Sequence, residues 1–299
     1  MTVLEVIQRS TDFLTKKGVE SARLQTELLL ADVLKLPRMQ LYLNFERALT
    51  TTEVETVREL VRRRGQREPL QHILGSTSFC GLEIMVNRHT LIPRPETELL
   101  AEHAWLFLNQ LPVLRCASDA GGSTALDFGT GSGCLAIALA SKCLAARVHA
   151  LDVSAEALAL ARQNAARHGL AERIDFYEGD GFAAVLPGAR FDLIISNPPY
   201  IPSAEIVKLQ QEVRDHDPRT ALDGGSDGLE FFRRLAAEAT TFLRPRGKLM
   251  LEFGDGQAAD VGRIFEQEKW IVEATHLDYN QRPRILIARR ADSYRNESA

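Results

Sequence analysis

The sequence predicts an α/β protein with a doubly wound, mostly parallel sheet of seven strands, preceded by a small helical domain and a β-hairpin connector. Three observations predict this fold. From Thr124 onward, short apolar segments typical of strands alternate with segments of helical character, as in parallel sheets covered by helices. A glycine-rich turn at 129–133 separates the first of these strands from its helix. Before that region, apolar side chains in residues 1–75 recur at helical spacing.

The helical domain is expected to contain three main helices. The first begins near Val3, the second covers 24–34, and the third begins near Thr51, which resembles a helix cap. The end of the third helix is strongly basic and carries Arg62, Arg63, Arg64 and Arg67. The simpler interpretation is a solvated last turn that complements the helix dipole. The alternative is a docking surface for an acidic or RNA-bearing partner.

A connector follows the helical domain. Residues 79–86 alternate in polarity around Gly81, which suits a hairpin or a bulge. Residues 91–98 form a stiff segment held by two prolines, and a helix is expected over 96–109. Residues 110–123 have the composition of a flexible surface loop. The expected division of the chain is a helical substrate-recognition domain at 1–75, a connector at 76–95, an α/β domain at 96–290 and a tail at 291–299.

The α/β domain alternates strands with helices. Ser154 is expected to cap the helix that ends near His168, with Gly169 just beyond it. Other helices are expected from Cys134, over 228–243 and near 257–268. The last two strands are close enough in sequence to pair antiparallel, so the final strand should oppose the others. The expected strands are 125–128, 147–152, 174–177, 191–196, 248–253, 270–278 and 284–289.

Composition limits the possible functions. The chain has 299 residues, 45% of them hydrophobic and 25% charged, which is ordinary for a globular protein. A net charge of −4 argues against broad nucleic-acid binding. The N-terminus does not resemble a signal peptide and no apolar run is long enough to span a bilayer, so a cytoplasmic location is expected. The four cysteines, which show no metal-binding spacing and are expected to be reduced thiols, are Cys80, Cys116, Cys134 and Cys143.

The glycine-rich turn indicates a nucleoside cofactor. It reads Gly129, Thr130, Gly131, Ser132 and Gly133, a spacing of G-x-G-x-G rather than the dinucleotide pattern G-x-G-x-x-G. Glycines allow a tight turn and a close approach of the backbone to a ligand.

Acidic residues follow the next two strands. Asp152 closes the second strand about 20 residues after the glycines, where an acid accepts ribose hydroxyls, although it also suits a cap of the following helix. Asp180 ends the third strand and is placed to accept an adenine amino proton. Gly181 and Phe182 follow, and the Phe182 ring is expected either on the adenine face or in the core. All of these loops leave the carboxyl ends of strands, where open α/β sheets bind ligands.

The fourth strand ends in Asn197, Pro198, Pro199 and Tyr200. Two prolines stop the strand and hold a rigid loop. The Asn197 side-chain carbonyl supplies one hydrogen-bond acceptor, and a backbone carbonyl of Ser196, Asn197 or Pro198 supplies a second. Two fixed acceptors suit a planar –NH2 group, which points to chemistry on an amide or amino nitrogen beside the cofactor.

Beyond these single residues, longer motifs resemble those of the HemK-type peptide chain release factor glutamine N5-methyltransferases over nearly the whole chain. Besides Gly75, the matching segments are FCGL at 79–82, LIPRPETE at 91–98, LDFGTGSG at 126–133, NPPYI at 197–201, ALDGG at 221–225, DGL at 227–229 and LEFG at 251–254. The NPPY segment alone is shared with other amino methyltransferases, so LIPRPETE joined to a helical domain is the specific part.

The resemblance implies S-adenosylmethionine as the methyl donor and the glutamine of the Gly-Gly-Gln loop of class 1 release factors as the acceptor. It assigns 129–133 to the methionine and ribose side of the cofactor, Asp152 to the ribose, and Asp180 with Gly181 to the adenine. It also assigns 197–200 to the substrate glutamine, and Asn197, Pro198 and Tyr200 are expected in the catalytic role. The protein is then expected to act as a monomer, without a metal, a membrane or direct contact with nucleic acid.

Three alternatives remain open on sequence grounds. An amino methyltransferase acting on adenine or guanine in DNA or RNA would use the same acceptors on an exocyclic amine. A non-catalytic binding module would keep the loops without the reaction. A dinucleotide oxidoreductase is disfavoured by the glycine spacing and has no use for the loop at 197–200.

Overall fold

The computed structural model of the protein describes residues 1–114 and 122–291. Its contacts divide the chain into two compact units. The helical unit comprises Met1–Ser76 together with Leu209–His216, and the sheet unit comprises Thr77–Lys208 together with the chain from Asp217 onward. The expected loop at 110–123 is wrong at its start, because 110–114 continue a helix. The rest of that loop up to 121, including Cys116, and the tail beyond 291 lie outside the described residues.

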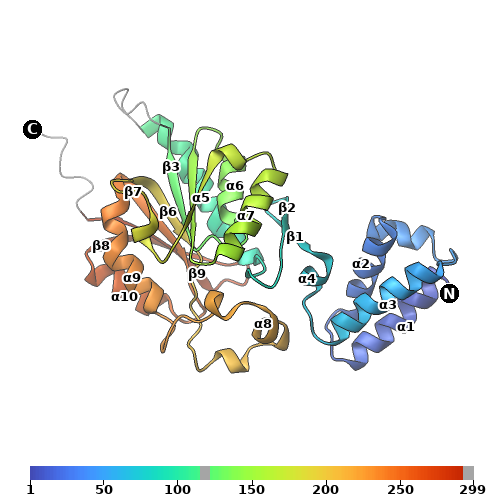
Figure 1. The fold of residues 1–299 in the computed structure, drawn as a ribbon. Helices are drawn as coiled ribbons and strands as arrows, with labels where there is room; N and C mark the ends of the chain where they lie inside the picture. Colours follow the sequence, from blue (N-terminus) through green and yellow to red (C-terminus); the bar gives the residue numbers. More distant parts are fainter. Residues whose placement is uncertain (115–121, 292–299) are drawn as a thin grey trace, which may run out of the picture. The chain divides into compact units, whose positions relative to one another are not determined.

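The sheet unit is built on a seven-stranded sheet with the order β5-β4-β3-β6-β7-β9-β8 (Figure 1). All neighbouring strands are parallel except β9, which runs antiparallel to both β7 and β8. The predicted doubly wound sheet with an antiparallel last strand is therefore confirmed. The strands are β3 Thr124–Phe128, β4 Arg147–Asp152, β5 Ile174–Glu178, β6 Phe191–Ser196, β7 Leu243–Glu252, β8 Trp270–Leu277 and β9 Pro283–Arg290.

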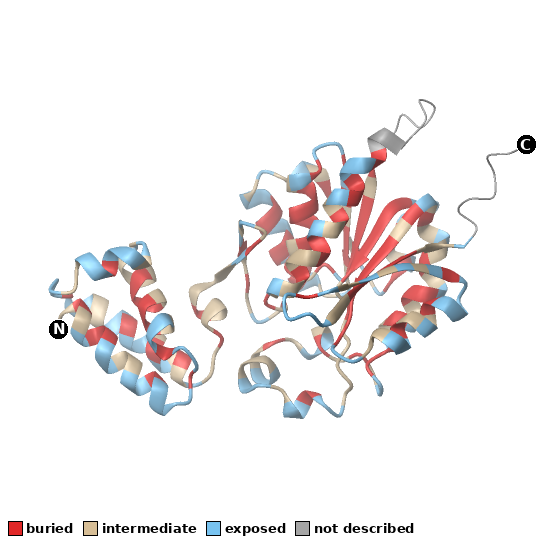
Figure 2. Cartoon of the chain, turned by 180° about the vertical axis from the view of Figure 1, so that it is seen from behind, coloured by how far each residue is buried: buried red, intermediate tan, exposed pale blue. Residues whose placement is uncertain are grey.

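Helices cover both faces of this sheet, and the strands between them are buried (Figure 2). The core of one face includes residues of α5 Pro95–Leu114, α6 Cys134–Lys142 and α7 Ala155–Arg167. The core of the other face includes residues of α9 Glu230–Glu238 and α10 Ala258–Gln267. The expected helix over 228–243 is thus too long, since 239–242 form a 3-10 turn and β7 already begins at Leu243.

The connector forms the expected hairpin. Strands β1 Ser76–Phe79 and β2 Leu82–Met85 make a two-stranded sheet. The turn residues Cys80 and Gly81 both have positive φ, 51° and 77°, as in the turns that match the twist of paired strands. The buried Asn164 side chain on α7 accepts a hydrogen bond from the Met85 N–H at 2.8 Å and donates to the Met85 carbonyl at 3.0 Å. The hairpin is therefore fixed to the sheet unit.

The sheet reverses its strand order between β3 and β6. From β3 the chain winds outward through β4 and β5, and it then returns to the other side of β3 as β6. The Ser196 hydroxyl at the end of β6 donates to the Phe128 carbonyl at the end of β3, at 2.6 Å. Loops that leave two such strand ends diverge and open a crevice, which is the usual ligand site of an open α/β sheet.

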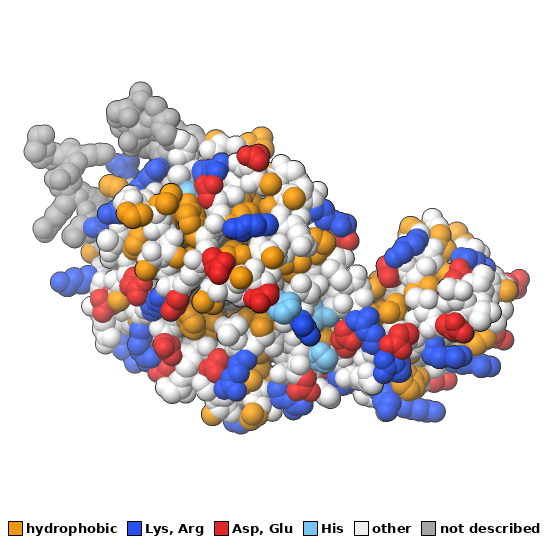
Figure 3. Space-filling model, in the orientation of Figure 1, with side chains coloured by type: hydrophobic (Ala, Val, Ile, Leu, Met, Phe, Trp, Pro, Cys, Tyr) orange, Lys and Arg blue, Asp and Glu red, His pale blue; other side chains and the backbone are white. Residues whose placement is uncertain are grey.

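The distribution of charged side chains on the surface agrees with the small net charge of the chain. On the face drawn in Figure 3, basic and acidic side chains of the described residues are interspersed rather than separated into broad areas of one sign. None of the helices in the described chain combines the length and the apolar character needed to cross a bilayer.

The helical unit has three main helices, α1 Val3–Lys16, α2 Ala22–Leu34 and α3 Thr51–Gly65, with a short α4 Leu70–Leu74 and a 3-10 segment η1 Arg38–Leu43. The expected cap of α3 is off by one residue. Thr50 caps the helix, because its side chain accepts from the Glu53 N–H while the Glu53 carboxylate accepts from the Thr50 N–H. The shared core includes Ile7, Leu14, Leu29, Leu30, Val57 and Val61.

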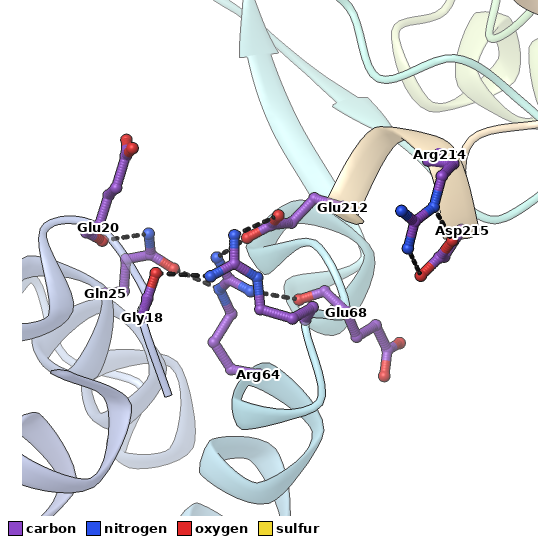
Figure 4. Close-up of polar contacts among 9 residues, drawn as sticks. Gly18, Glu20, Gln25, Arg64, Glu68, Glu212, Arg214 and Asp215 are labelled. Carbon is purple, nitrogen blue, oxygen red and sulfur yellow. Dashed lines mark hydrogen bonds and ion pairs between the residues drawn. The ribbon is translucent and has the colours of Figure 1, made fainter. Parts of the chain in front are cut away.

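The four arginines at the end of α3 all form ion pairs with carboxylates of the helical unit. Arg64 is only 4% exposed and binds Glu212 at 2.7 Å, and Arg67 binds the other oxygen of the same carboxylate at 2.7 Å (Figure 4). Glu212 lies on the short helix α8 Gln211–His216, which follows the fourth-strand loop in sequence yet belongs to the helical unit. Arg62 and Arg63 pair with Glu59 and Glu68. The interpretation as a solvated last turn therefore fits Arg62 but not the buried Arg64, and the docking alternative stays a prediction.

Candidate functional site

A cavity of about 130 Å³ lies at the carboxyl edge of the sheet. The strand-end loops after β3, β4, β5 and β6 all contribute to its wall. The structure thus brings together, from the predicted site residues, Gly129, Gly131, Asp152, Asp180, Gly181, Asn197 and Pro199.

The glycine-rich loop presents its backbone to the cavity. Gly129 and Gly131 have φ of 75° and 54°, and a Cβ added to either would meet no protein atom within 4 Å. Such a Cβ would project into open space beside the cavity. Gly133 serves a different purpose, because a Cβ there would come within 3.0 Å of Ala161 on α7. The first two glycines leave room for a ligand, and the third leaves room for helix packing.

Thr130 and Ser132, which lie between these glycines, support the loop from inside. They are 4% and 2% exposed and do not line the cavity. The Thr130 hydroxyl donates to Asp127 at 2.6 Å, and the Ser132 carbonyl accepts from Asn164 at 2.9 Å. Both residues lie in the loop as predicted, and the Thr130 side chain and the Ser132 backbone hold its shape.

Asp127 is a functional candidate that the sequence interpretation missed. Its carboxylate is fully buried at the end of β3, and one oxygen accepts from Thr130 and from the Ala136 N–H at 3.1 Å. The other oxygen, Oδ1, is buried without a hydrogen-bond partner in the described chain. Burial raises the pKa of Asp127 to about 7. The available signal was an acid inside an otherwise apolar strand, which is costly unless it has a purpose.

Asp152 lines the cavity and also anchors the loops on either side of it. One oxygen accepts from the Gly131 N–H at 2.8 Å, and the other accepts from the Ser154 N–H at 2.9 Å. Burial raises the pKa of Asp152. Each carboxylate oxygen has a second lone pair, so these two bonds leave acceptor capacity for a ligand. The two sequence interpretations, helix cap and ligand acceptor, are compatible.

In the loop after β5, Phe182 takes the second of its two expected places, the core. This side chain is 2% exposed and packs against the rings of Phe128 and Phe242, with centroids 4.9 and 4.6 Å away. It belongs to the core, so its ring face is not offered to the cavity. Asp180 is mainly exposed and pairs with Arg234 of α9, and a Cβ on Gly181 would collide with the same guanidinium at 2.0 Å.

An aromatic side chain does reach the cavity from α9. Phe231 lines it and precedes Arg234 by three residues. Residues three apart share a helix face, so Phe231 lies on the side of α9 that faces the loop of Asp180 and Gly181. The sequence interpretation did not consider it, because a phenylalanine in a helical pattern is usually core.

The two polar atoms of the Asn197 side chain differ in their hydrogen bonding. Its Nδ2 donates to the Thr97 hydroxyl at 3.0 Å, whereas its Oδ1 makes no hydrogen bond within the described chain. Pro198 is buried and Pro199 borders the cavity. The Tyr200 hydroxyl donates to the Glu252 carboxylate at 3.3 Å. The side chain of Asn197 therefore offers one unengaged acceptor at the cavity wall.

Behind Asn197 lies a buried carboxylate. Glu252, at the end of β7, is 1% exposed and accepts from the Thr97 hydroxyl at 2.6 Å. Burial raises the pKa of Glu252, while the hydrogen bond from Thr97, the charge of Arg284 and the hydrogen bond from Tyr200 oppose that rise. Neither Thr97 nor Glu252 was singled out from the sequence, although both lie in the motifs LIPRPETE and LEFG.

The cysteines and possible metal ligands play no visible part in this site. In residues 1–114 and 122–291, no three His, Cys, Asp or Glu side chains are grouped as a metal site would require. Cys80, Cys134 and Cys143 are free thiols. Burial raises the pKa of Cys80 to about 12 and that of Cys143 to about 11, so both remain protonated.

Comparison with known proteins places this geometry in a family. Residues 5–75 match the model of the PrmC N-terminal domain, and residues 104–217 match that of the methyltransferase small domain. The chain is 45% identical over 288 residues to a release factor glutamine methyltransferase of Geobacter sulfurreducens, covering 96% of each chain. It is 43% identical over 288 residues to one of Chlorobaculum tepidum, covering 95% of this chain and 96% of the other. The chain belongs to the release factor glutamine methyltransferase family.

The resemblance drawn from the motifs is thereby confirmed. A solved human structure, methyltransferase 10 domain containing protein, aligns with a TM-score of 0.51 at 16% identity, covering 71% of this chain and 89% of that one, and supports the methyltransferase fold alone. As a member of this family, the protein is a methyltransferase that uses S-adenosylmethionine. The oxidoreductase and the non-catalytic alternatives are thereby set aside.

The residues at the cavity fit this cofactor. Gly129 and Gly131 leave the space that side chains would fill, and Asp152 keeps acceptor capacity for ribose hydroxyls. Phe231 adds an aromatic wall.

Proposed function

We propose that this protein transfers a methyl group from S-adenosylmethionine to the side-chain amide nitrogen, N5, of the glutamine in the Gly-Gly-Gln loop of class 1 peptide chain release factors, in support of translation termination. The observation that carries the proposal is the orientation of the Asn197 side chain. Its amide nitrogen donates a hydrogen bond to Thr97, and its carbonyl oxygen is left without a bond in the described chain at the wall of the cavity. Relatives that match nearly the whole chain are named release factor glutamine methyltransferases, which supports the proposal.

The chemical problem is the weak nucleophile. The lone pair of an amide nitrogen is delocalised into its carbonyl group. Bound S-adenosylmethionine supplies a methyl group on a positively charged sulfur and is therefore already activated. The Asn197 Oδ1 and the Pro198 carbonyl accept the two N–H hydrogens of the glutamine, which turns the nitrogen lone pair toward the cavity. Holding the reacting groups in line contributes up to about 7–11 kcal/mol in favourable cases.

The same two acceptors act during the reaction. Positive charge grows on the nitrogen as the new bond forms, and the fixed carbonyl dipoles of Asn197 and Pro198 stabilise it. The surplus proton leaves to water after transfer. Tyr200, whose hydroxyl is held by Glu252, supplies a wall for the aliphatic part of the glutamine.

The cofactor is assigned to the predicted loops with one change. Residues 129–133 take the methionine and ribose side, Asp152 takes the ribose hydroxyls, and Asp180 with Gly181 takes the adenine. Because Phe182 is buried in the core, we assign the ring contact with adenine to Phe231.

Residues 1–75 are assigned to recognition of the release factor, 76–95 with the hairpin to the connector, and 96–290 to catalysis. We place the protein in the cytoplasm as a monomer that does not bind nucleic acid directly. The mixed charges on the face drawn in Figure 3 and the net charge of −4 support the last point.

Mass spectrometry tests the proposal directly. A class 1 release factor is incubated with the protein and S-adenosylmethionine, and its peptides are searched for one added methyl on the Gly-Gly-Gln glutamine. A release factor with asparagine at that position is the matched control and should remain unmodified. Methylation of DNA or RNA in a parallel reaction, with none on the release factor, would overturn the proposal in favour of an amino methyltransferase acting on bases.

A further inference from the structure

The orientation of the Asn197 carboxamide depends on residues that come from distant parts of the chain. Thr97 lies in the first turn of α5, and Glu252 ends β7. Asn197, Thr97 and Glu252 form a continuous series of hydrogen bonds, with distances of 3.0 and 2.6 Å. Thr97 is 2% exposed and Glu252 is 1% exposed, so water does not compete for these bonds.

The series has a fixed direction because a hydroxyl has a single proton. The Thr97 hydroxyl donates this proton to Glu252 Oε2. The Thr97 oxygen then has only lone pairs to offer to Asn197. The Asn197 amide must meet it with its NH2 group, and its carbonyl oxygen must point elsewhere.

We propose that Thr97 and Glu252 are positioning residues that set which atom of Asn197 faces the substrate. They make Asn197 Oδ1, and not Nδ2, the group available at the cavity. A flipped amide would present N–H donors to the –NH2 of the glutamine and repel it. This inference rests on the proposed function, because the acceptor is needed only for a substrate amide.

Variants of Thr97 test the role without changing the cavity. Thr97→Val keeps the shape and removes the hydroxyl, so Asn197 loses the bond that orients it. We expect kcat for release factor methylation to fall by about tenfold or more, as for loss of one oriented group at a transition state, with KM and cofactor affinity nearly unchanged. Thr97→Ser restores the hydroxyl and should recover most of that loss. Glu252→Gln, whose amide can donate to Thr97 and so reverse the series, should also lower kcat.

A double-mutant cycle separates positioning from general support of the fold. If Thr97 acts through Asn197, then Thr97→Val should have no further effect on kcat in the Asn197→Ala background. An equal loss in both backgrounds would overturn the inference. The matched control is Thr26→Val in the helical unit, because Thr26 is fully buried and its hydroxyl has no hydrogen-bond partner among the described residues. This control should leave kcat unchanged.

A spectroscopic readout makes the inference testable without catalysis. The side-chain NH2 signals of Asn197 are assigned in NMR spectra by their disappearance in Asn197→Ala. They should shift in Thr97→Val and return toward their original positions in Thr97→Ser. Signals that do not move in Thr97→Val would overturn the inference, whatever the activity. If the wild-type protein leaves the release factor unmethylated while these signals do shift, the proposed function fails and the positioning role stands.

Discussion

The two loops that border the cavity are built in different ways. The loop after β3 presents backbone, with Gly129 and Gly131 next to open space and its buried side chains turned inward. The loop after β6 presents one side chain, Asn197, whose orientation comes from a buried hydrogen-bond series. If the two loops bind cofactor and substrate as proposed, the difference teaches that cofactor binding depends on shape, whereas substrate binding depends on the direction of hydrogen bonds. Substitutions should therefore affect the two sides through different measurements.

The largest effect is expected at the substrate loop. Asn197→Ala removes the free acceptor and should lower kcat for the release factor by about 10²-fold or more, since one preorganised group is worth about 3 kcal/mol in a transition state. Calorimetry should show an almost unchanged affinity for S-adenosylmethionine, because the alanine still leaves the glycine-rich loop and Asp152 intact. A variant that methylates at the wild-type rate would remove Asn197 from the mechanism.

The next effect concerns the support of the cofactor loop by Asp127. Its pKa of about 7 lies above the ordinary value of 3.8, so the folded protein binds more protons than the unfolded chain between these values. Asp127 therefore makes the free energy of unfolding fall as pH rises through this range. Asparagine does not titrate, so Asp127→Asn lacks this pH dependence. Its free energy of unfolding relative to that of the wild type should therefore rise with pH by a few kcal/mol, and the difference should become constant above pH 7.

Denaturant titrations followed by tryptophan fluorescence measure this difference. Both tryptophans, Trp105 and Trp270, lie in the sheet unit and report on its unfolding. Asp12→Asn, at an exposed site of the helical unit, is the control. A stability difference between Asp127→Asn and the wild type that stays constant with pH would contradict the assignment of a raised pKa to Asp127.

How far the sequence could predict this site depends on the distance over which each interaction acts. Asp152 and Asn197 were found because each ends a strand, and parallel strands bring such ends to one edge. The cap of α7 by Ser154 was also local and is confirmed. These predictions needed only neighbouring residues.

The residues that were missed or misplaced depend on tertiary contacts. Thr97 and Glu252 are 155 positions apart, and Arg64 meets Glu212 across 148 positions. No local pattern indicates such pairs. Phe182 illustrates the converse, because its position after Asp180 suggested a ligand contact while packing against Phe128 and Phe242 placed it in the core. Local patterns therefore indicate which loops form a site, and packing decides which side chains enter it.

A smaller effect is expected at Asp152, where a side chain serves the cofactor side. Asp152→Ala removes the acceptor for the ribose and also the bonds to the Gly131 and Ser154 N–H groups. Bonds to a charged acceptor are worth about 1.5–3 kcal/mol, so affinity for S-adenosylmethionine should fall by about tenfold or more. Calorimetry measures it, with Asn197→Ala as the comparison that should keep its affinity. Unchanged cofactor binding would remove Asp152 from the ribose site.

The smallest effect tests the shape requirement of the cofactor loop by itself. Gly131 and Gly169 have φ of 54° and 68°, and a Cβ on either meets no protein atom within 4 Å. Alanine at either position adopts a left-handed conformation that costs about 1–2 kcal/mol, so both variants should be similarly less stable. Only Gly131 borders the cavity, whereas Gly169 follows α7 outside it. Gly131→Ala should therefore weaken S-adenosylmethionine binding in calorimetry, and Gly169→Ala should not. If both variants kept wild-type affinity, the space beside Gly131 would not hold the cofactor. The proposal that the loop after β3 binds the cofactor through its shape would then be wrong.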